Sequence, residues 1–90
     1  METKHIQTAS GFEWDMDLAV MDDILLIEDI AALDQGDLLK MSIILSKLLG
    51  EDGKQALYAH LLTADGRVPI EALSNALAEI FDAIGDSGKK

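Results

Sequence analysis

The residues of this chain that could carry out chemistry are few and widely spaced. Its 90 residues include two histidines, His5 and His60, and no cysteine, which removes thiolate metal ligands and cysteine nucleophiles. His5 lies in a polar N-terminal segment, and His60 has no carboxylate at a spacing that would build a metal site or a general base. The acidic pairs at 22–23 and 28–29 are adjacent, so on a helix their side chains point about 100° apart. We therefore expect no catalytic residues, no cofactor and no enzymatic activity.

Residues 61–72 have part of the spacing of a calcium-binding loop without its ligands. Gly66 and Val68 would take the sixth and eighth positions of an EF-hand. The first, third and twelfth positions would then be leucine, Thr63 and alanine, where calcium needs carboxylate oxygens. Asp65 alone cannot hold the ion, so we interpret this stretch as an ordinary turn and expect no bound metal.

The chain is acidic, and the acid is concentrated in its first part. The formal net charge is −10; residues 1–37 hold ten acidic residues and one lysine, whereas residues 38–90 hold seven acidic and six basic residues. Such a protein repels phosphate backbones, so we expect no binding to nucleic acid. Two interpretations of the charge stay open. Either the acidic residues keep an unusually apolar chain in solution, or the protein mimics DNA or binds a basic partner.

The hydrophobic content and the length of the apolar runs indicate the broad class of protein. With 49% hydrophobic residues, the chain can build one folded domain with an aliphatic core. The longest apolar run, Ile24 to Ile27, is far too short to cross a bilayer, and residues 1–10 lack the apolar stretch of a secretion signal. We expect a soluble intracellular protein that does not enter a membrane.

Residue periodicity predicts an all-α fold, a small bundle of about four helices with a short extended or β N-terminal arm. We expect the helices at about 18–34, 38–49, 53–62 and 69–84, within a single domain at 11–85. The arm at 11–16 alternates apolar and acidic residues and would pair with its copy in another subunit or lie across the helices. Residues 1–10 and 86–90 are expected to be flexible tails.

The first two helices carry more apolar surface than one buried stripe requires. In the second, Leu38, Met41, Ile44, Leu45 and Leu48 share a face, while Leu39 and Ile43 lie opposite. In the first, Val20, Ile24, Ile27 and Ala31 share a stripe, while Leu25, Leu26 and Leu33 point elsewhere.

Exposed apolar patches generally mark interaction surfaces, so we expect a partner or self-association there. The candidate contact residues are Leu25, Leu26, Leu33, Leu39 and Ile43, joined by Trp14 on the arm. For Trp14 two roles stay open, a core anchor or an interface anchor.

Several short motifs follow one another from Gly11 to the C-terminus. They are Phe12-Glu13-Trp14, an acidic apolar first helix, Leu48-Leu49-Gly50, Leu57-Tyr58 with His60, Asp65-Gly66-Arg67-Val68-Pro69, and Ile80-Phe81 before the closing Gly-Lys. In this order and spacing the chain resembles the tail assembly chaperones of long-tailed bacteriophages, especially those that infect Gram-positive bacteria.

The resemblance implies a helical protein that coats the apolar tape-measure protein while subunits of the major tail-tube protein assemble around it. It implies action in the cytoplasm of the bacterial host, absence from the mature virion, and a longer product made by ribosomal frameshifting. A homo-oligomer is expected. The alternative is a non-catalytic acidic helical adaptor, or a DNA-mimic or regulatory protein of phage or bacterial origin.

Overall fold

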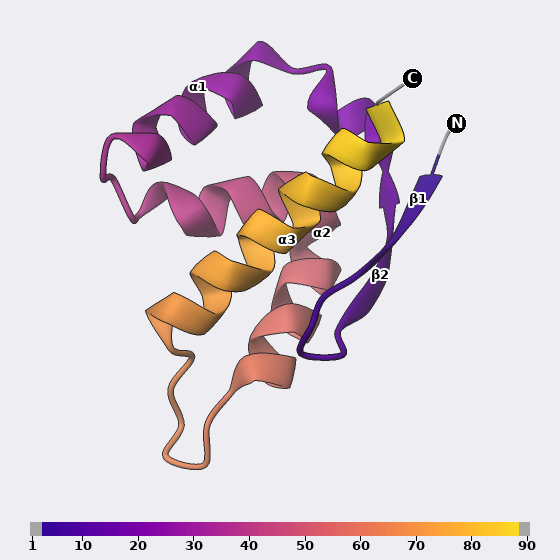
Figure 1. Cartoon of the computed structure of the whole chain (residues 1–90). Helices are drawn as coiled ribbons and strands as arrows, with labels where there is room; N and C mark the ends of the chain where they lie inside the picture. Colours follow the sequence, from indigo (N-terminus) through magenta and orange to yellow (C-terminus); the bar gives the residue numbers. More distant parts are fainter. Residues whose placement is uncertain (1–2, 89–90) are drawn as a thin grey trace.

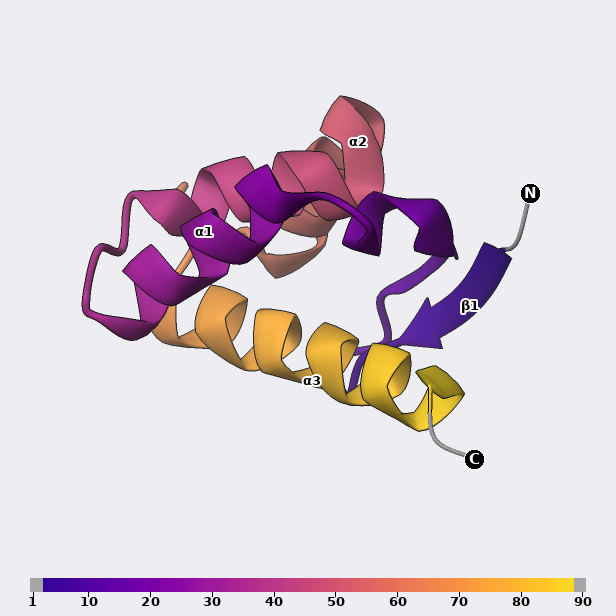
Figure 2. The ribbon, with the colours of Figure 1, turned by 90° about the horizontal axis from the view of Figure 1, so that it is seen from above.

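The computed structural model describes residues 3–88, which form an N-terminal β-hairpin packed against helices (Figure 1). The elements in chain order are β1 (Thr3–Gln7), β2 (Glu13–Asp17), the short 3-10 helix η1 (Leu18–Met21), α1 (Ile24–Asp34), α2 (Lys40–Leu61) and α3 (Ile70–Gly88). The chain reverses between α1 and α2, and α3 crosses in front of α2. Seen from above, α2 and α3 occupy separate layers, and the hairpin lies at the C-terminal end of α3 (Figure 2).

The expected all-α bundle of about four helices is wrong. A two-stranded antiparallel sheet opens the chain, so residues 3–7 form a strand where a flexible tail was expected. The extended arm at 11–16 was correctly expected to have strand character. However, its partner is the preceding segment of the same chain and not another subunit. A lone strand leaves its backbone groups unpaired, and a neighbour across a tight turn supplies partners at the lowest entropic cost.

The hairpin buries one of its faces against the helices. Its buried side chains are Ile6, Thr8, Phe12 and Met16. Ile6 pairs in register with Trp14, so the alternation along β2 places Trp14 on the same inward face. The turn closes through a hydrogen bond from the amide of Thr8 to the carbonyl of Phe12 (2.9 Å), and Gly11 supplies the positive φ of 98° that the turn needs.

Aspartates cap the two helical segments that follow the hairpin. The Asp17 carboxylate accepts a hydrogen bond from the amide of Ala19 and caps η1. The Asp23 carboxylate accepts one from the amide of Leu25 and caps α1. The expected helix at 18–34 is therefore split, because each cap satisfies its own set of free amide groups.

The expected helices at 38–49 and 53–62 are the two halves of α2. Gly50 separates them with a non-helical backbone (φ 76°, ψ 168°), and Figure 1 shows the bend. That conformation belongs almost entirely to glycine, so the expected break at Gly50 is confirmed. The bend places the second half of α2 beside β2 and lets both halves contribute to one core.

The core is aliphatic and lies between α2, α3, α1 and the hairpin. Its most deeply buried large side chains are Ile6, Met16, Leu26, Ile44, Leu45, Leu57 and Ile80. The C-terminal helix was expected to end near residue 84. It continues to Gly88, so residues 86–88 are helical where a flexible tail was expected. Residues 89–90, the rest of that expected tail, lie outside the described residues.

Candidate interaction surface

The outward face of the first half of α2 carries Leu39 and Ile43. Met41, Ile44 and Leu45 on the other face are buried, while Leu39 is 83% exposed and Ile43 is 42% exposed. Since α2 begins at Lys40, Leu39 lies at its N-terminal cap, where its own chain does not cover it. The prediction that Leu39 and Ile43 point away from the core is confirmed. Leu38, which was expected on the core face, is 53% exposed and lies in the turn before α2.

In α1, two of the three leucines that were expected on the outward surface pack inward, and two isoleucines of the other stripe are exposed. Leu26 is fully buried, and Leu33 is partly buried against the core, so neither belongs to an outward surface. Leu25, at 59% exposed, does lie on the surface. Ile24 and Ile27 are also exposed (67% and 45%) and form an outward stripe three residues apart.

Two ion pairs link the inward face of α1 to α2. The Asp29 carboxylate lies 2.8 Å from Nζ of Lys47 and 3.6 Å from Nζ of Lys40. Its side chain is only 14% exposed, so the contact lies at the seam between the helices. The hydrogen bond from Lys47 holds the pKa of Asp29 below its ordinary value. A helix that is apolar on most of its circumference receives its orientation from this charge contact and from the packing of Leu26.

Trp14 packs inward, which is the core-anchor role. Its indole stacks on Phe12 with the ring centroids 6.2 Å apart, and it packs against the buried cluster. A Cβ atom added to Gly53 would lie 2.8 Å from Cε2 and 2.9 Å from Nε1 of Trp14. The indole therefore lies directly against the backbone of α2 where that residue has no side chain. Trp14 remains half-buried and leaves part of its ring at the surface.

An apolar hollow of about 290 Å³ opens beside Leu39. The start of α2, its second half and the segment leading into α3 all contribute to its walls. The principal lining side chains are Leu38, Leu39, Tyr58, Val68, Ile70 and Leu73. A second hollow of about 530 Å³ shares Val68 and Ile70 with the first and is also lined by Thr63, Arg67 and Pro69. Sequence reasoning missed this feature, because its walls come from three separate segments.

A cation stands at the edge of the first hollow. The Lys54 ammonium donates a hydrogen bond to Ser42, which lines the hollow, and lies 5.9 Å from the centroid of the Tyr58 ring. It also pairs with Glu51 at 3.4 Å. No carboxylate lines either hollow in the part of the chain that the structure describes. In a chain of net charge −10, the side chains that line these two hollows therefore carry no negative charge.

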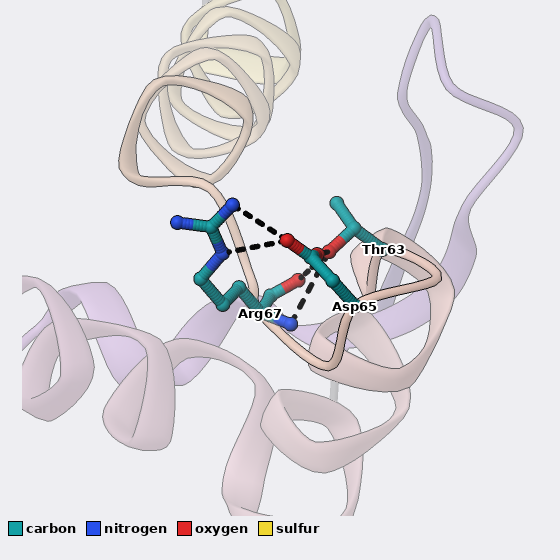
Figure 3. Close-up of polar contacts among 3 residues, drawn as sticks. All are labelled: Thr63, Asp65 and Arg67. Atoms are coloured by element: carbon teal, nitrogen blue, oxygen red, sulfur yellow. Dashed lines mark hydrogen bonds and ion pairs between the residues drawn. The ribbon is translucent and has the colours of Figure 1, made fainter.

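The turn between α2 and α3 is held by a compact polar network (Figure 3). Nη2 and Nε of Arg67 donate to the Asp65 carboxylate at 2.6 and 3.1 Å, and the Thr63 hydroxyl donates to the same carboxylate. The amide of Arg67 in turn donates to the Thr63 hydroxyl. The hydrogen bonds from Thr63 and then Arg67 lower the pKa of Asp65. This carboxylate, the only one at a ligand position of the EF-hand-like spacing, is engaged in closing the turn that borders the hollows.

The two histidines make separate structural contacts. His5 lies across the hairpin between Asp15 (2.6 Å) and Glu13 (2.8 Å), and the hydrogen bond with Asp15, then that with Glu13, raises its pKa. His60 hydrogen-bonds the carbonyl of Ser10 at 2.9 Å, which ties the end of α2 to the hairpin turn. The structure does not bring the two histidines into one cluster with a shared carboxylate.

Among residues 3–88, no cluster of three or more histidine, aspartate or glutamate side chains has the arrangement of a metal site. Within the same residues, none of the helices is both long enough and apolar enough to cross a membrane. No protein-family model, no curated protein and no solved structure matches the chain.

Proposed function

We propose that this protein is a non-catalytic assembly chaperone that covers an apolar helical segment of a client protein. The observation that carries the proposal is the uncovered apolar surface on α1 and α2, above all Leu39 at 83% exposed, with Ile43 and Leu25. Large apolar side chains that a small domain leaves in water generally mark a binding surface. Apolar contact is non-directional, so one surface can accept many registers along a long client.

The resemblance to tail assembly chaperones gives the client its proposed identity. In that family the client is the tape-measure protein, whose long apolar helix must stay soluble until the major tail-tube protein assembles around it. The acidic charge supports the same role, because a net charge of −10 keeps a complex of two apolar proteins in solution. Self-association, action in the host cytoplasm and absence from the finished virion belong to the same proposal.

Co-expression with a tape-measure protein encoded beside this chain tests the proposal. We expect the tape-measure protein to be insoluble alone and to become soluble and co-purify when this chain is present. A tape-measure protein that stays insoluble, or that is soluble to the same extent without this chain, would overturn the proposed client. A control in which an unrelated acidic helical protein replaces this chain distinguishes specific binding of the client from solubilisation by negative charge alone.

A further inference from the structure

We propose that α1 is a hinged cover over a second part of the client-binding surface, and that it moves off α2 when an apolar helix of the client binds. The covered surface is the face of the first half of α2 that α1 occupies in the free protein. A client helix takes the place of α1 there. The inference deepens the proposed function and rests on it for the identity of the client.

The helix α1 is attached to the rest of the domain along one side. It packs mainly on α2, with a smaller contact to η1, and Figures 1 and 2 show it beside the first half of α2 with a non-helical connection at each end. Leu26 is its fully buried residue, and Ile30 and Leu33 are partly buried against the core. A helix held by one short stripe of side chains opens at a lower free energy than elements at the centre of the core.

Both connections of α1 can act as hinges, because the hydrogen bonds around them belong to one side or the other. The amide of Asp37 donates to the carbonyl of Ala32 at the end of α1, whereas its carbonyl accepts from the amide of Lys40 at the start of α2. At the other connection, Asp22 closes η1 and Asp23 caps α1. Rotation about the backbone torsions at these two points moves α1 relative to α2 without breaking either set of bonds.

The face of α2 beneath α1 is apolar with a cation on each side. Lys40, Ile44 and Lys47 follow one another at spacings of four and three residues, so they share one face of the helix. Asp29 of α1 pairs with both lysines, which places α1 over the turn that carries the fully buried Ile44. Opening of α1 therefore presents an apolar strip and two lysines without their partner. The occupant that fits is an apolar helix carrying a carboxylate where α1 carries Asp29.

This covered face continues into the surface that is already exposed. Ile43 lies three residues after Lys40 and four before Lys47, so it stands at the border between the covered face and the outward face. It is 42% exposed, and Leu39 beside it is 83% exposed. A client helix that first contacts these two side chains is therefore next to the edge of α1 and can extend its contact as α1 moves away.

The composition of α1 suits an exchange of this kind. Every residue of α1 except Glu28, Asp29 and Asp34 is apolar, so the helix has no continuous polar face that would hold it in one orientation. Apolar contact is non-directional, so another apolar helix can replace it on α2. In the free protein, α1 keeps the covered strip out of water, which limits the apolar area open to nonspecific contact.

Amide hydrogen exchange of the client-free protein measures the opening of α1. We expect the amides of α1 to be less protected than those of the first half of α2 by roughly tenfold or more. Asp29→Asn should lower the protection of α1 further, by roughly fivefold, because it removes the charge that pairs with the two lysines. The matched control is Glu28→Gln, which removes the same charge from an exposed position of the same helix.

The opening should appear in the affinity for the client by the same factor. When only the open fraction binds, the apparent Kd falls in proportion as that fraction rises. Asp29→Asn should therefore bind a helical segment of the tape-measure protein more tightly than the parent protein by roughly the factor seen in exchange. Glu28→Gln should match the parent protein in both measurements.

A cleavable lock gives the decisive comparison, because the native chain has no cysteine. Asp29→Cys with Lys47→Cys places two thiols where the ion pair now joins α1 to α2, and a short cleavable thiol-specific cross-linker then holds the cover shut. The linked protein should bind the tape-measure segment more weakly, by roughly tenfold or more, than the same molecules after cleavage of the linker. Circular dichroism of the linked and cleaved forms verifies that both are folded.

Equal protection of α1 and the first half of α2, or equal affinity of the linked and cleaved forms, would overturn the inference and leave the chaperone role standing. A parent protein that does not bind the tape-measure segment would overturn the proposed function, and the role of the cover with it.

Discussion

Replacing Gly53 with alanine should destabilise the protein, although alanine is the better helix former. Inside an exposed stretch of helix, alanine stabilises by about 1 kcal/mol relative to glycine. At Gly53, however, the new Cβ would lie 2.6 Å from Cβ of Leu49 and 2.8 Å from Cε2 of Trp14. Carbon atoms in good contact are about 3.5–4.0 Å apart, so each of these contacts is too short by roughly 1 Å.

The clash is difficult to relieve, because neither neighbour is the free end of a flexible side chain. The Cβ of Leu49 is fixed to the backbone one residue before the bend at Gly50, and Trp14 is held by the hairpin and by Phe12. Overpacking of this kind costs about 1–3 kcal/mol. With the clash at the upper end of that range and the helix gain subtracted, we expect a net loss of about 1–2 kcal/mol.

Gly85→Ala in α3 is the matched control, since an added Cβ there meets no atom within 4 Å. It should raise the free energy of unfolding by about 0.5–1 kcal/mol. Urea unfolding followed by fluorescence of the single tryptophan and by circular dichroism measures both variants. In thermal unfolding followed by the same two signals, the two variants should differ in Tm by roughly 10 °C for a domain of this size. If Gly53→Ala stabilises as much as Gly85→Ala, the packing of the indole against α2 is wrong.

Three further predictions concern single positions. Gly50→Ala should lower the free energy of unfolding by about 1–3 kcal/mol in urea titrations, because the backbone conformation of Gly50 (φ 76°, ψ 168°) is strained for any residue with a side chain. The cost comes from the backbone alone, since an added Cβ meets no atom within 4 Å. An unchanged midpoint of the urea transition would contradict the bend at Gly50. His5 should titrate above its ordinary pKa of 6.5 by NMR, and Asp15→Asn should lower that pKa; the stabilisation should be complete below pH 6.5 and lost as pH rises through the raised pKa. Asp29→Asn should remove a stabilising contribution that is present above pH 3.8 and is lost as pH falls through the lowered pKa of Asp29; acid-unfolding curves that coincide for the two proteins would refute it.

Much of the helical part of this fold could be predicted from local signals. Each capping aspartate accepts a hydrogen bond from the amide only two residues later in the chain. Gly50 interrupts α2 because its backbone conformation is strained for any other residue. The outward direction of Leu39 and Ile43 follows from the 3.6-residue period once the face with Ile44 and Leu45 is recognised as the core.

The parts that could not be predicted depend on contacts between distant segments. The strand β1 contains one strongly apolar residue, Ile6, and becomes a strand because β2 offers it partners. In α1, apolar residues cover most of the circumference, so periodicity cannot decide which face is buried. The buried face is the one that carries Leu26, which packs into the core although sequence reasoning placed it on the surface, and Asp29, which pairs with two lysines of α2.

The two hollows are the clearest case of a feature that cannot be predicted from any single segment of the sequence. Tyr58 and Ile70 are twelve residues apart, and the first hollow forms only because the turn from Thr63 to Arg67 folds α3 back toward α2. Asp65 has a signal in the sequence, but that signal resembles part of a metal-binding loop. Its role in the fold is to close the turn through Thr63 and Arg67.

The most direct test of the account measures how tightly the purified chain binds a helical segment of the tape-measure protein, with and without its outward apolar side chains. Burial of Leu39 and of the exposed part of Ile43 is worth about 3 kcal/mol together, so Leu39→Ser with Ile43→Ser should weaken binding roughly a hundredfold. The double variant should remain folded, because Leu39 and Ile43 are 83% and 42% exposed and neither belongs to the buried core, and Leu62→Ser should bind like the parent protein. A double variant that unfolds would place these residues in the core, and one that binds with unchanged affinity would show that this surface does not hold the client.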